Sequence, residues 1–230
     1  MKPEIAIEAL LKHSIEGKAL QMAAYHKTKR RYLGVANPAI DAEVKTWRAE
    51  LDIEARVALA DALWRSDIHE ARIAAAKLLT QARIQPDQAA WELIKSWVPD
   101  FDGEAIADHV CTAGQKRLEA DPSRFDEIEI WTKSTDIWTR RTVLTITQPW
   151  TKQNNPKPAD IALRDRVLDW AASYLPDSNR LIQNAVAGWL RDLSKHDPDS
   201  VRAFLKKHKK GVKPFVRKEA TRHMNQPTTS

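Results

Sequence analysis

The chain has 230 residues, an apolar fraction of 43% and a formal net charge of +6. This length allows one large domain or two small ones with a real core. The one cysteine, Cys111, excludes an internal disulfide and a zinc site built from clustered cysteines, and no apolar run approaches the ~18 residues that a transmembrane helix needs. Because the charged N-terminus also lacks an apolar signal core, we expect a protein of the reducing cytoplasm.

Helices dominate the pattern. Glycine is scarce, with six residues, and strong helix formers are abundant. Asp87, Asp121, Ser178 and Asp197 mark helix starts. Apolar residues recur at helical spacing in residues 38–51, 53–64, 69–83, 87–98, 103–118, 162–175, 178–193 and 198–208.

Two segments depart from this pattern. Residues 141–148, "RTVLTITQ", have the β-branched composition of a strand, but a lone strand between helices has no partner, so we expect a helix. Residues 151–160, "TKQNNPKPAD", are expected to form an exposed loop.

The spacing of the helices predicts the architecture. Roughly a dozen helices in pairs about 35–40 residues apart are typical of an all-α, HEAT-like or armadillo-like solenoid with a concave basic groove. A compact helical bundle is the alternative. We expect one repeat domain over residues 1–223 and a flexible tail over residues 224–230.

Charge is distributed unevenly along the chain. Residues 202–223 hold nine Lys or Arg against one Glu, and residues 27–31, "KTKRR", add four basic residues. Residues 87–137 hold twelve acidic and five basic residues. Basic ends suggest a polyanionic partner, although each run is also compatible with an ordinary solvated surface.

Five stretches stand out in chain order: "AAYHKTKRRYLGVANPAI" at 23–40, "LADALWRSDIHEARIAAAKLL" at 59–79, "FDGEAIADHV" at 101–110, "DIWTRRTVL" at 136–144 and "LIQNAVAGWLRDL" at 181–193. The ordered set resembles the DNA alkylation repair (AlkD-like) family of HEAT-repeat DNA glycosylases. The resemblance covers nearly the whole chain. It implies removal of alkylated purines from duplex DNA by hydrolysis of the N-glycosidic bond.

The resemblance also assigns roles to particular residues. Asp108 aligns with the catalytic carboxylate, which would stabilise the sugar cation and orient water. Arg141 aligns with an arginine that supports the site and grips phosphate, whereas Arg140, about 100° around the helix, is expected to face solvent or another helix. The DNA-contacting set comprises Tyr25, Lys27, Lys29, Arg30, Arg31, Trp138, Trp189, Lys206, Lys207, Lys209, Lys210 and Lys213.

Two positions depart from the family. Where the family commonly has a tryptophan one turn before the catalytic aspartate, this chain has Glu104. Glu104 and Asp108 then form a carboxylate pair on one helix face, with Glu104 a further candidate for the catalytic set. A second expected tryptophan aligns with Gly188, while Trp189 stands one place on.

Other patterns favour structural roles. His69 and His109 lack the spacing of metal ligands, so we expect no metal. The sequence also lacks a glycine-rich phosphate-binding loop, so we expect no nucleotide cofactor. Cys111 is expected in the core, as are Trp47, Trp64, Trp91 and Trp170.

Three functions follow from these observations. The first is an alkylpurine DNA glycosylase that acts as a monomer, without a cofactor, on duplex DNA. The second is a non-catalytic binder of damaged or branched DNA on the same scaffold. The third is a protein–protein scaffold whose basic ends keep it soluble.

Overall fold

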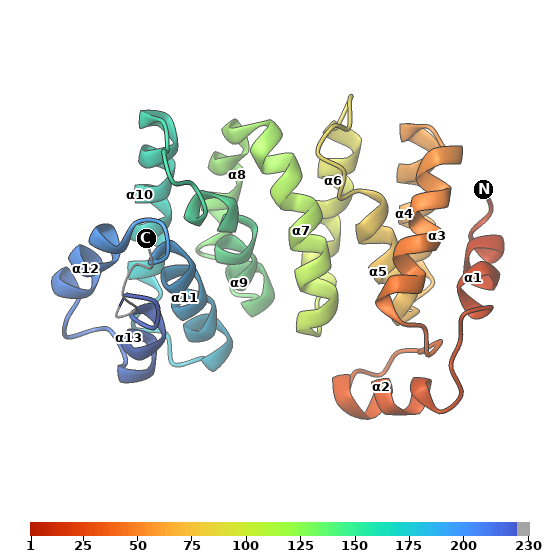
Figure 1. Ribbon diagram of the computed structural model, residues 1–230, viewed down its shortest axis with the longest axis horizontal. Helices are drawn as coiled ribbons and strands as arrows, with labels where there is room; N and C mark the ends of the chain where they lie inside the picture. The colour runs from red at the N-terminus through yellow and green to blue at the C-terminus, as the bar shows by residue number, and fades with distance from the viewer. Residues whose placement is uncertain (225–230) are drawn as a thin grey trace, which may run out of the picture. The chain divides into compact units, whose positions relative to one another are not determined.

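The computed structural model describes residues 1–224, and the regular secondary structure in this range is helical (Figure 1). It contains thirteen α-helices and three short 3-10 helices. Within the described range no β-strand forms, and Arg31 and Ile68 make an isolated bridge. The predicted all-α helical-repeat class is therefore confirmed.

The chain divides into two compact units, Met1–Ala120 and Asp121–Ser230. Unit 1 contains α1 (Pro3–Leu11), α2 (Lys18–His26), α3 (Asn37–Glu50), α4 (Ile53–Arg65), α5 (His69–Leu78), α6 (Gln88–Trp97), the 3-10 helix η1 (Val98–Asp100) and α7 (Glu104–Ala120). Unit 2 contains η2 (Pro122–Arg124), α8 (Phe125–Trp131), α9 (Ile137–Ile146), η3 (Gln148–Thr151), α10 (Pro158–Ser173), α11 (Arg180–Leu193), α12 (Pro198–Lys207) and α13 (Pro214–Ala220).

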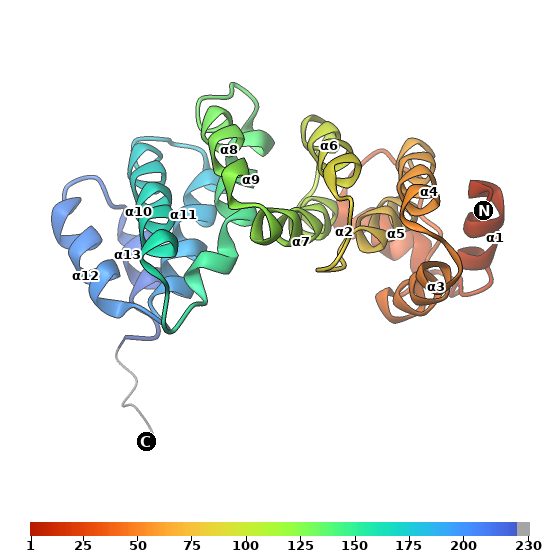
Figure 2. The same ribbon diagram turned by 90° about the horizontal axis from the view of Figure 1, so that it is seen from above.

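Unit 1 has two helical layers (Figure 2). Helices α3, α5 and α7 pack side by side, and α4 and α6 form the second layer against them. Helix α5 lies between α3, α4 and α7, so nearly all its residues are buried. Its alanine-rich sequence, "ARIAAA", allows neighbouring helices to approach closely. Trp64 and Trp97 stack with ring centroids 4.5 Å apart in the second layer.

A buried carboxylate joins the N-terminal arm, residues 25–35, to this core. Glu70 on α5 is 0% exposed, and its side chain accepts hydrogen bonds from the backbone N–H groups of Leu33, Gly34 and Val35 at 2.9, 2.8 and 3.1 Å. Three N–H donors replace the water that the carboxylate loses on burial. The interaction fixes the chain between α2 and α3 against α5.

Gly34 is required at the centre of this turn. Its φ is +78°, a conformation that other residues rarely adopt, and an added Cβ would lie 2.9 Å from the backbone nitrogen of Ala19. The "LGV" and "HEA" stretches, 36 residues apart at Gly34 and Glu70, thus form one structural feature.

Helix α11 is central to unit 2. Helix α11 packs between α9 and α13, and its buried face carries Ile182, Val186 and Leu190. Phe125 of α8 packs edge-on against Trp150, with centroids 4.7 Å apart. The buried Arg164 guanidinium donates to the Trp150 carbonyl and to Asp197, both at 3.0 Å. It thereby links α10 to η3 and to the N-cap of α12.

Most predicted helices are confirmed, with shifts at their ends. Residues 141–146 are helical as expected, within α9. The predicted loop over 151–160 is shorter, because η3 extends to Thr151 and α10 begins at Pro158. The observed spacing of the helix pairs is close to the predicted one. Helices α4, α6, α8, α10 and α12 begin at residues 53, 88, 125, 158 and 198.

The predicted C-terminal tail is described only at its first residue. Met224 lies in a turn and donates its N–H to the Thr221 carbonyl at 3.0 Å, whereas residues 225–230 lie outside the described residues. The single domain over 1–223 stays a prediction. In the described range, no helix has both the length and the apolar character needed to span a bilayer.

Replacing Glu70 tests the anchor of the N-terminal arm. Glu70→Ala would leave three buried N–H donors without an acceptor, and we expect a loss of about 3 kcal/mol or more in the free energy of unfolding. Urea unfolding measures it. Glu119→Ala, at an exposed position near the end of α7, should change the same quantity by less than about 0.5 kcal/mol. Similar small losses for both variants would contradict the assignment.

Candidate functional site

The first two turns of α7 present the predicted carboxylates. Glu104 begins the helix and Asp108 follows one turn later, and both are exposed. Ile106 and Val110 on the other face of α7 are buried. The helical period therefore fixes which face enters the core and leaves the two carboxylates together on the solvent side.

The N-terminal arm packs beside the start of α7. Arg30 donates from both terminal nitrogens to the two oxygens of Asp102, each at 3.0 Å. A Cβ at Gly103 would lie 3.6 Å from the Thr28 methyl group, in ordinary contact. The arm thus contacts the two residues that precede α7.

Arg30 is not the surface DNA contact that the sequence suggested. Its side chain is 5% exposed, and its Nε also donates to Asp67 at 3.0 Å. Arg72 pairs with the same carboxylate at 3.1 Å. Because two carboxylates surround the guanidinium, Arg30 holds the arm, the α4–α5 turn and the α7 start together. We therefore remove it from the DNA-contacting set.

The rest of the arm projects outward. Tyr25 is 81% exposed, and Lys27, Lys29 and Arg31 are exposed as well. The Arg31 carbonyl accepts from the backbone N–H of His69 at 2.9 Å. The backbone of the arm is thus fixed, while the four side chains remain accessible.

A group of rings underlies the arm. The His69 ring lies 4.4 Å from that of His26 and 4.8 Å from that of Tyr32, and the Tyr25 ring meets His26 edge-on at 5.0 Å. Burial lowers the pKa of His69 to about 3, with further lowering from His26, Arg30 and His109. His69 is therefore neutral at physiological pH.

His109, next to Asp108, is also held toward its neutral form. Burial lowers its pKa first and Lys77 adds to this, whereas Asp108 and Asp41 act in the opposite direction. Lys77 itself is paired with Asp41 at 2.5 Å. Burial thus favours the uncharged form of the imidazole next to Asp108.

Arg141 and Trp138 lie on one face of α9 in unit 2. Asp136 caps this helix by accepting from the Thr139 N–H at 2.6 Å. One turn of helix separates Trp138 from Arg141, and the Arg141 guanidinium carbon lies 5.7 Å from the Trp138 ring centroid. Both side chains are half-buried. Asp108 belongs to unit 1 and Arg141 to unit 2.

Arg140 is half-buried and bonds to loop residues, whereas the sequence predicted that it faces solvent or another helix. Its Nη1 donates to the Ser134 carbonyl at 2.7 Å and its Nη2 to Asp177 at 3.2 Å, beyond the end of α10. The Tyr174 hydroxyl donates to the Arg140 carbonyl at 3.3 Å. Arg140 therefore links α9 to the segment after α10, and its neighbour Arg141 is directed elsewhere.

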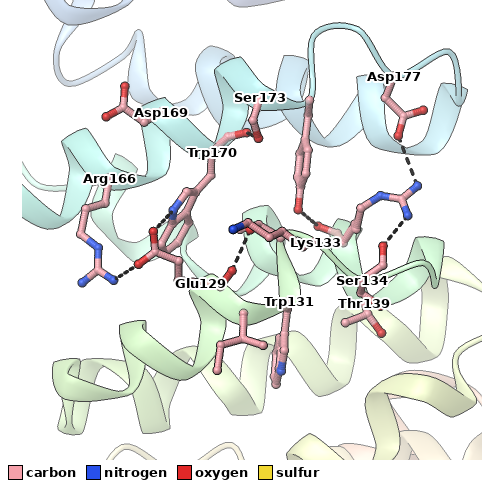
Figure 3. Close-up of a pocket in the computed structure, with 14 residues that line it drawn as sticks. Glu129, Trp131, Lys133, Ser134, Thr139, Arg166, Asp169, Trp170, Ser173 and Asp177 are labelled. Atoms are coloured by element: carbon pink, nitrogen blue, oxygen red, sulfur yellow. Dashed lines mark hydrogen bonds and ion pairs between the residues drawn. The ribbon is translucent and has the colours of Figure 1, made fainter.

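Arg140 also lines a pocket of about 1200 Å³ between α8 and α10 (Figure 3). Glu129 accepts from Arg166 at 2.6 Å and from the Trp170 indole at 3.3 Å on one side of the pocket. These hydrogen bonds from Arg166 and Trp170 lower the pKa of Glu129. None of the predicted site residues lines the pocket.

The predicted C-terminal lysines fall into two kinds. Lys213 is half-buried and donates to the Asp177 carbonyl at 2.6 Å, so it stabilises a loop. The others, Lys206, Lys207, Lys209 and Lys210, are exposed.

Trp189 does not lie on a surface. It is 1% exposed and belongs to the buried face of α11, so the expectation that it contacts DNA is wrong. Gly188, about 100° around the helix, instead lines a pocket between α11 and α13. Sequence reasoning missed most other residues of that pocket, including Arg180 and Phe215. The one signal in the sequence was the spacing of Arg180 and Gly188, which places both on one face of a helix. The sequence could not show that α13 packs against that face.

Several structural expectations are confirmed. Trp47, Trp64, Trp91 and Trp170 are buried, and so is Cys111.

The chain belongs to the DNA alkylation repair enzyme family, whose profile matches residues 6–224. This confirms the resemblance seen in the sequence. No curated protein matches the chain.

Solved structures share the fold. A predicted DNA alkylation repair enzyme from Enterococcus faecalis is 18% identical with a TM-score of 0.77, covering 94% of this chain and 98% of that one. AlkD2 from Streptococcus mutans is 19% identical with a TM-score of 0.69, covering 98% and 100% of the two chains. The protein smu.31 from Streptococcus mutans UA159 is 21% identical with a TM-score of 0.63, covering 81% and 92%.

The buried His69 makes stability depend on pH. Its pKa is about 3 in the folded protein and 6.5 as the ordinary value, so below pH 6.5 the unfolded chain binds a proton that the folded protein does not. Stability should therefore fall as pH drops from 7 toward 3, by up to about 1.4 kcal/mol per pH unit below 6.5. Urea unfolding between pH 7 and 5 should show a shallower pH dependence for His69→Gln, with the part due to His109 remaining. Identical slopes for variant and wild type would refute this.

Proposed function

We propose that this protein removes N3- or N7-alkylated purines from duplex DNA by hydrolysing the N-glycosidic bond. The observation that carries the proposal is the exposed Asp108 on α7, a helix whose start is held by the Arg30–Asp102 pair. Membership of the DNA alkylation repair family supports the substrate class. The protein would act as a cytoplasmic monomer without a cofactor.

The chemistry follows from charge. Alkylation at N3 or N7 makes the purine cationic, so the C1′–N bond breaks with its electron pair moving to the base, which leaves neutral. The sugar develops an oxocarbenium charge, and the Asp108 carboxylate stabilises it. A water molecule attacks C1′ and loses its proton to Asp108, giving an abasic sugar and a free base.

Other residues take supporting roles in this proposal. Arg141, beside Trp138, contacts a DNA phosphate, and Glu104 helps to hold the attacking water. Exposed cations at the two ends of the chain bind further phosphates: Lys27, Lys29, Arg31, Lys206, Lys207, Lys209 and Lys210. Such contacts position the duplex and carry no sequence information.

A second candidate is a non-catalytic binder of damaged or branched DNA. The burial of Trp189 favours it, because neither α7 at Glu104 nor α11 at Gly188 then offers the tryptophan expected from the family. Binding would remain, since the exposed cations do not depend on those positions.

Base release from methylated duplex DNA separates the two candidates. We expect Asp108→Asn to slow single-turnover release by at least about 100-fold, since it removes the charge that opposes the sugar cation, while duplex binding persists. Glu119→Gln removes an exposed carboxylate from the same helix and should have no effect. Release by Asp108→Asn at the wild-type rate would eliminate Asp108 as the catalytic group. No release by wild type, with binding intact, would favour the binder.

Lys29 and Arg30 should differ in DNA binding although they are neighbours. Lys29 is exposed, so Lys29→Ala should lower the magnitude of the log–log salt slope of binding by about 0.9. Arg30→Ala should leave that slope unchanged and lower the free energy of unfolding by about 1.5–3 kcal/mol, because Arg30 bonds carboxylates. Fluorescence anisotropy over a NaCl series measures the slopes. An equal drop for both variants would show that Arg30 reaches phosphate after all.

A further inference from the structure

A pocket of about 360 Å³ lies in unit 2 between α11 and α13. Both helices belong to the same unit, so its geometry is independent of unit 1. Apart from Lys218, which is part of the basic C-terminal run, sequence reasoning gave none of its residues a binding role.

Gly188 keeps this pocket open. Arg180, Asn184, Gly188 and Arg191 share one face of α11 at helical spacing. A Cβ at Gly188 would meet only the Nη2 atom of Arg191, at 3.9 Å. The middle of that face is therefore open where another residue would place its side chain.

A cation stacked on a ring forms one wall. The Arg180 guanidinium carbon lies 3.6 Å from the centroid of the Phe215 ring on α13. Stacking fixes the plane of the guanidinium and leaves its N–H edges available for a planar or tetrahedral anion. Lys218 lies one helical turn after Phe215 and lines the same pocket. Both cations belong to exposed residues, and neither forms an ion pair with any residue from 1 to 224.

The acidic group in the pocket is already neutralised. Glu219 pairs with Arg191 at 3.0 Å and with Arg222 at 3.4 Å, and the hydrogen bond from Arg191 lowers the pKa of Glu219. Arg191 also bonds Asp192 at 3.2 Å. The charge left to attract a ligand is therefore that of Arg180 and Lys218.

We propose that this pocket binds a phosphate of a DNA strand, with Arg180 and Lys218 holding the phosphate oxygens. The Asn184 amide supplies a further hydrogen-bond donor, and the space at Gly188 takes the adjoining sugar. The inference rests on the proposed function, because DNA is the partner it assumes. A strand fits better than a free nucleotide, since the same unit carries further exposed lysines, at 206, 207, 209 and 210, that could bind other phosphates of the strand.

The test compares two variants from which the same amount of charge is removed. Arg180→Gln/Lys218→Gln removes the pocket cations, and Lys152→Gln/Lys157→Gln removes two exposed cations outside it. Binding to an undamaged duplex is measured by fluorescence anisotropy over a NaCl series. The pocket variant should bind about tenfold more weakly. Its log–log salt slope should be smaller in magnitude by about 0.9 for each phosphate that is no longer neutralised. The control variant should change affinity less than about threefold. Equal effects would overturn the proposal.

A charge-neutral change tests the space itself. Gly188→Trp should fill the pocket and weaken duplex binding about as much as the pocket variant, while Gly188→Ala should bind like wild type. Circular dichroism and thermal unfolding establish that both variants fold, and an unfolded Gly188→Trp leaves the test to the pocket-charge pair. Wild-type affinity in a folded Gly188→Trp would overturn the proposal.

Two further measurements separate its failure from that of the proposed function. Wild-type protein that releases base, while the pocket variant binds duplex like the control, would refute only the pocket. Wild-type protein that binds no duplex would refute the proposed function as well. If the pocket variant loses affinity for deoxyadenosine monophosphate but not for duplex, the ligand is a free nucleotide and the DNA assignment is wrong.

Discussion

The architecture of unit 1 depends on one buried carboxylate. Glu70 lies on the most buried helix of the unit and has no contact with solvent. An ionised group in such a place is tolerated only where several donors replace its hydration, and here three consecutive N–H groups do so. Those donors can converge because Gly34 adopts a positive φ beside the backbone of Ala19. The requirement to satisfy one charge therefore fixes a segment that has little regular secondary structure of its own.

The position of the candidate catalytic helix follows from that anchor. The arm that Glu70 holds carries Arg30, and Arg30 binds Asp102 just before α7 begins. Asp67 joins the same guanidinium to Arg72, whose guanidinium carbon lies 4.4 Å from the Trp64 ring centroid in the core. Electrostatic bonds between segments distant in sequence thus orient the helix face that presents Asp108. Catalysis by electrostatic stabilisation demands such fixed geometry, because a mobile carboxylate loses energy in reorganising as the reaction proceeds.

Periodicity was sufficient to predict the fold but not the accessibility of individual side chains. Apolar spacing located the helices and their order, since burial of one face is a local property of each helix. It could not distinguish Gly188 from Trp189, because a shift of one residue rotates a side chain by about 100° and the choice depends on which neighbours pack there. Arg30 looked like one member of a basic run. Its true partners, Asp67 and Asp102, are 37 and 72 residues away in the chain, so no local pattern could reveal that its charge is used within the protein.

The difference between buried and accessible side chains also changes how the net charge is understood. Arg72, Arg117, Arg124 and Arg164 are buried, so the cations available to a polyanion are fewer than the composition suggests. If the protein acts as proposed, the two exposed carboxylates in the first turns of α7, Glu104 and Asp108, repel phosphate and lower affinity for undamaged DNA. Their negative charge favours binding only where the ligand is positively charged, as a cationic purine and an oxocarbenium sugar are. Under the proposed function, one feature therefore weakens binding to ordinary duplex and stabilises the transition state at a lesion, which is the condition for catalysis through differential binding.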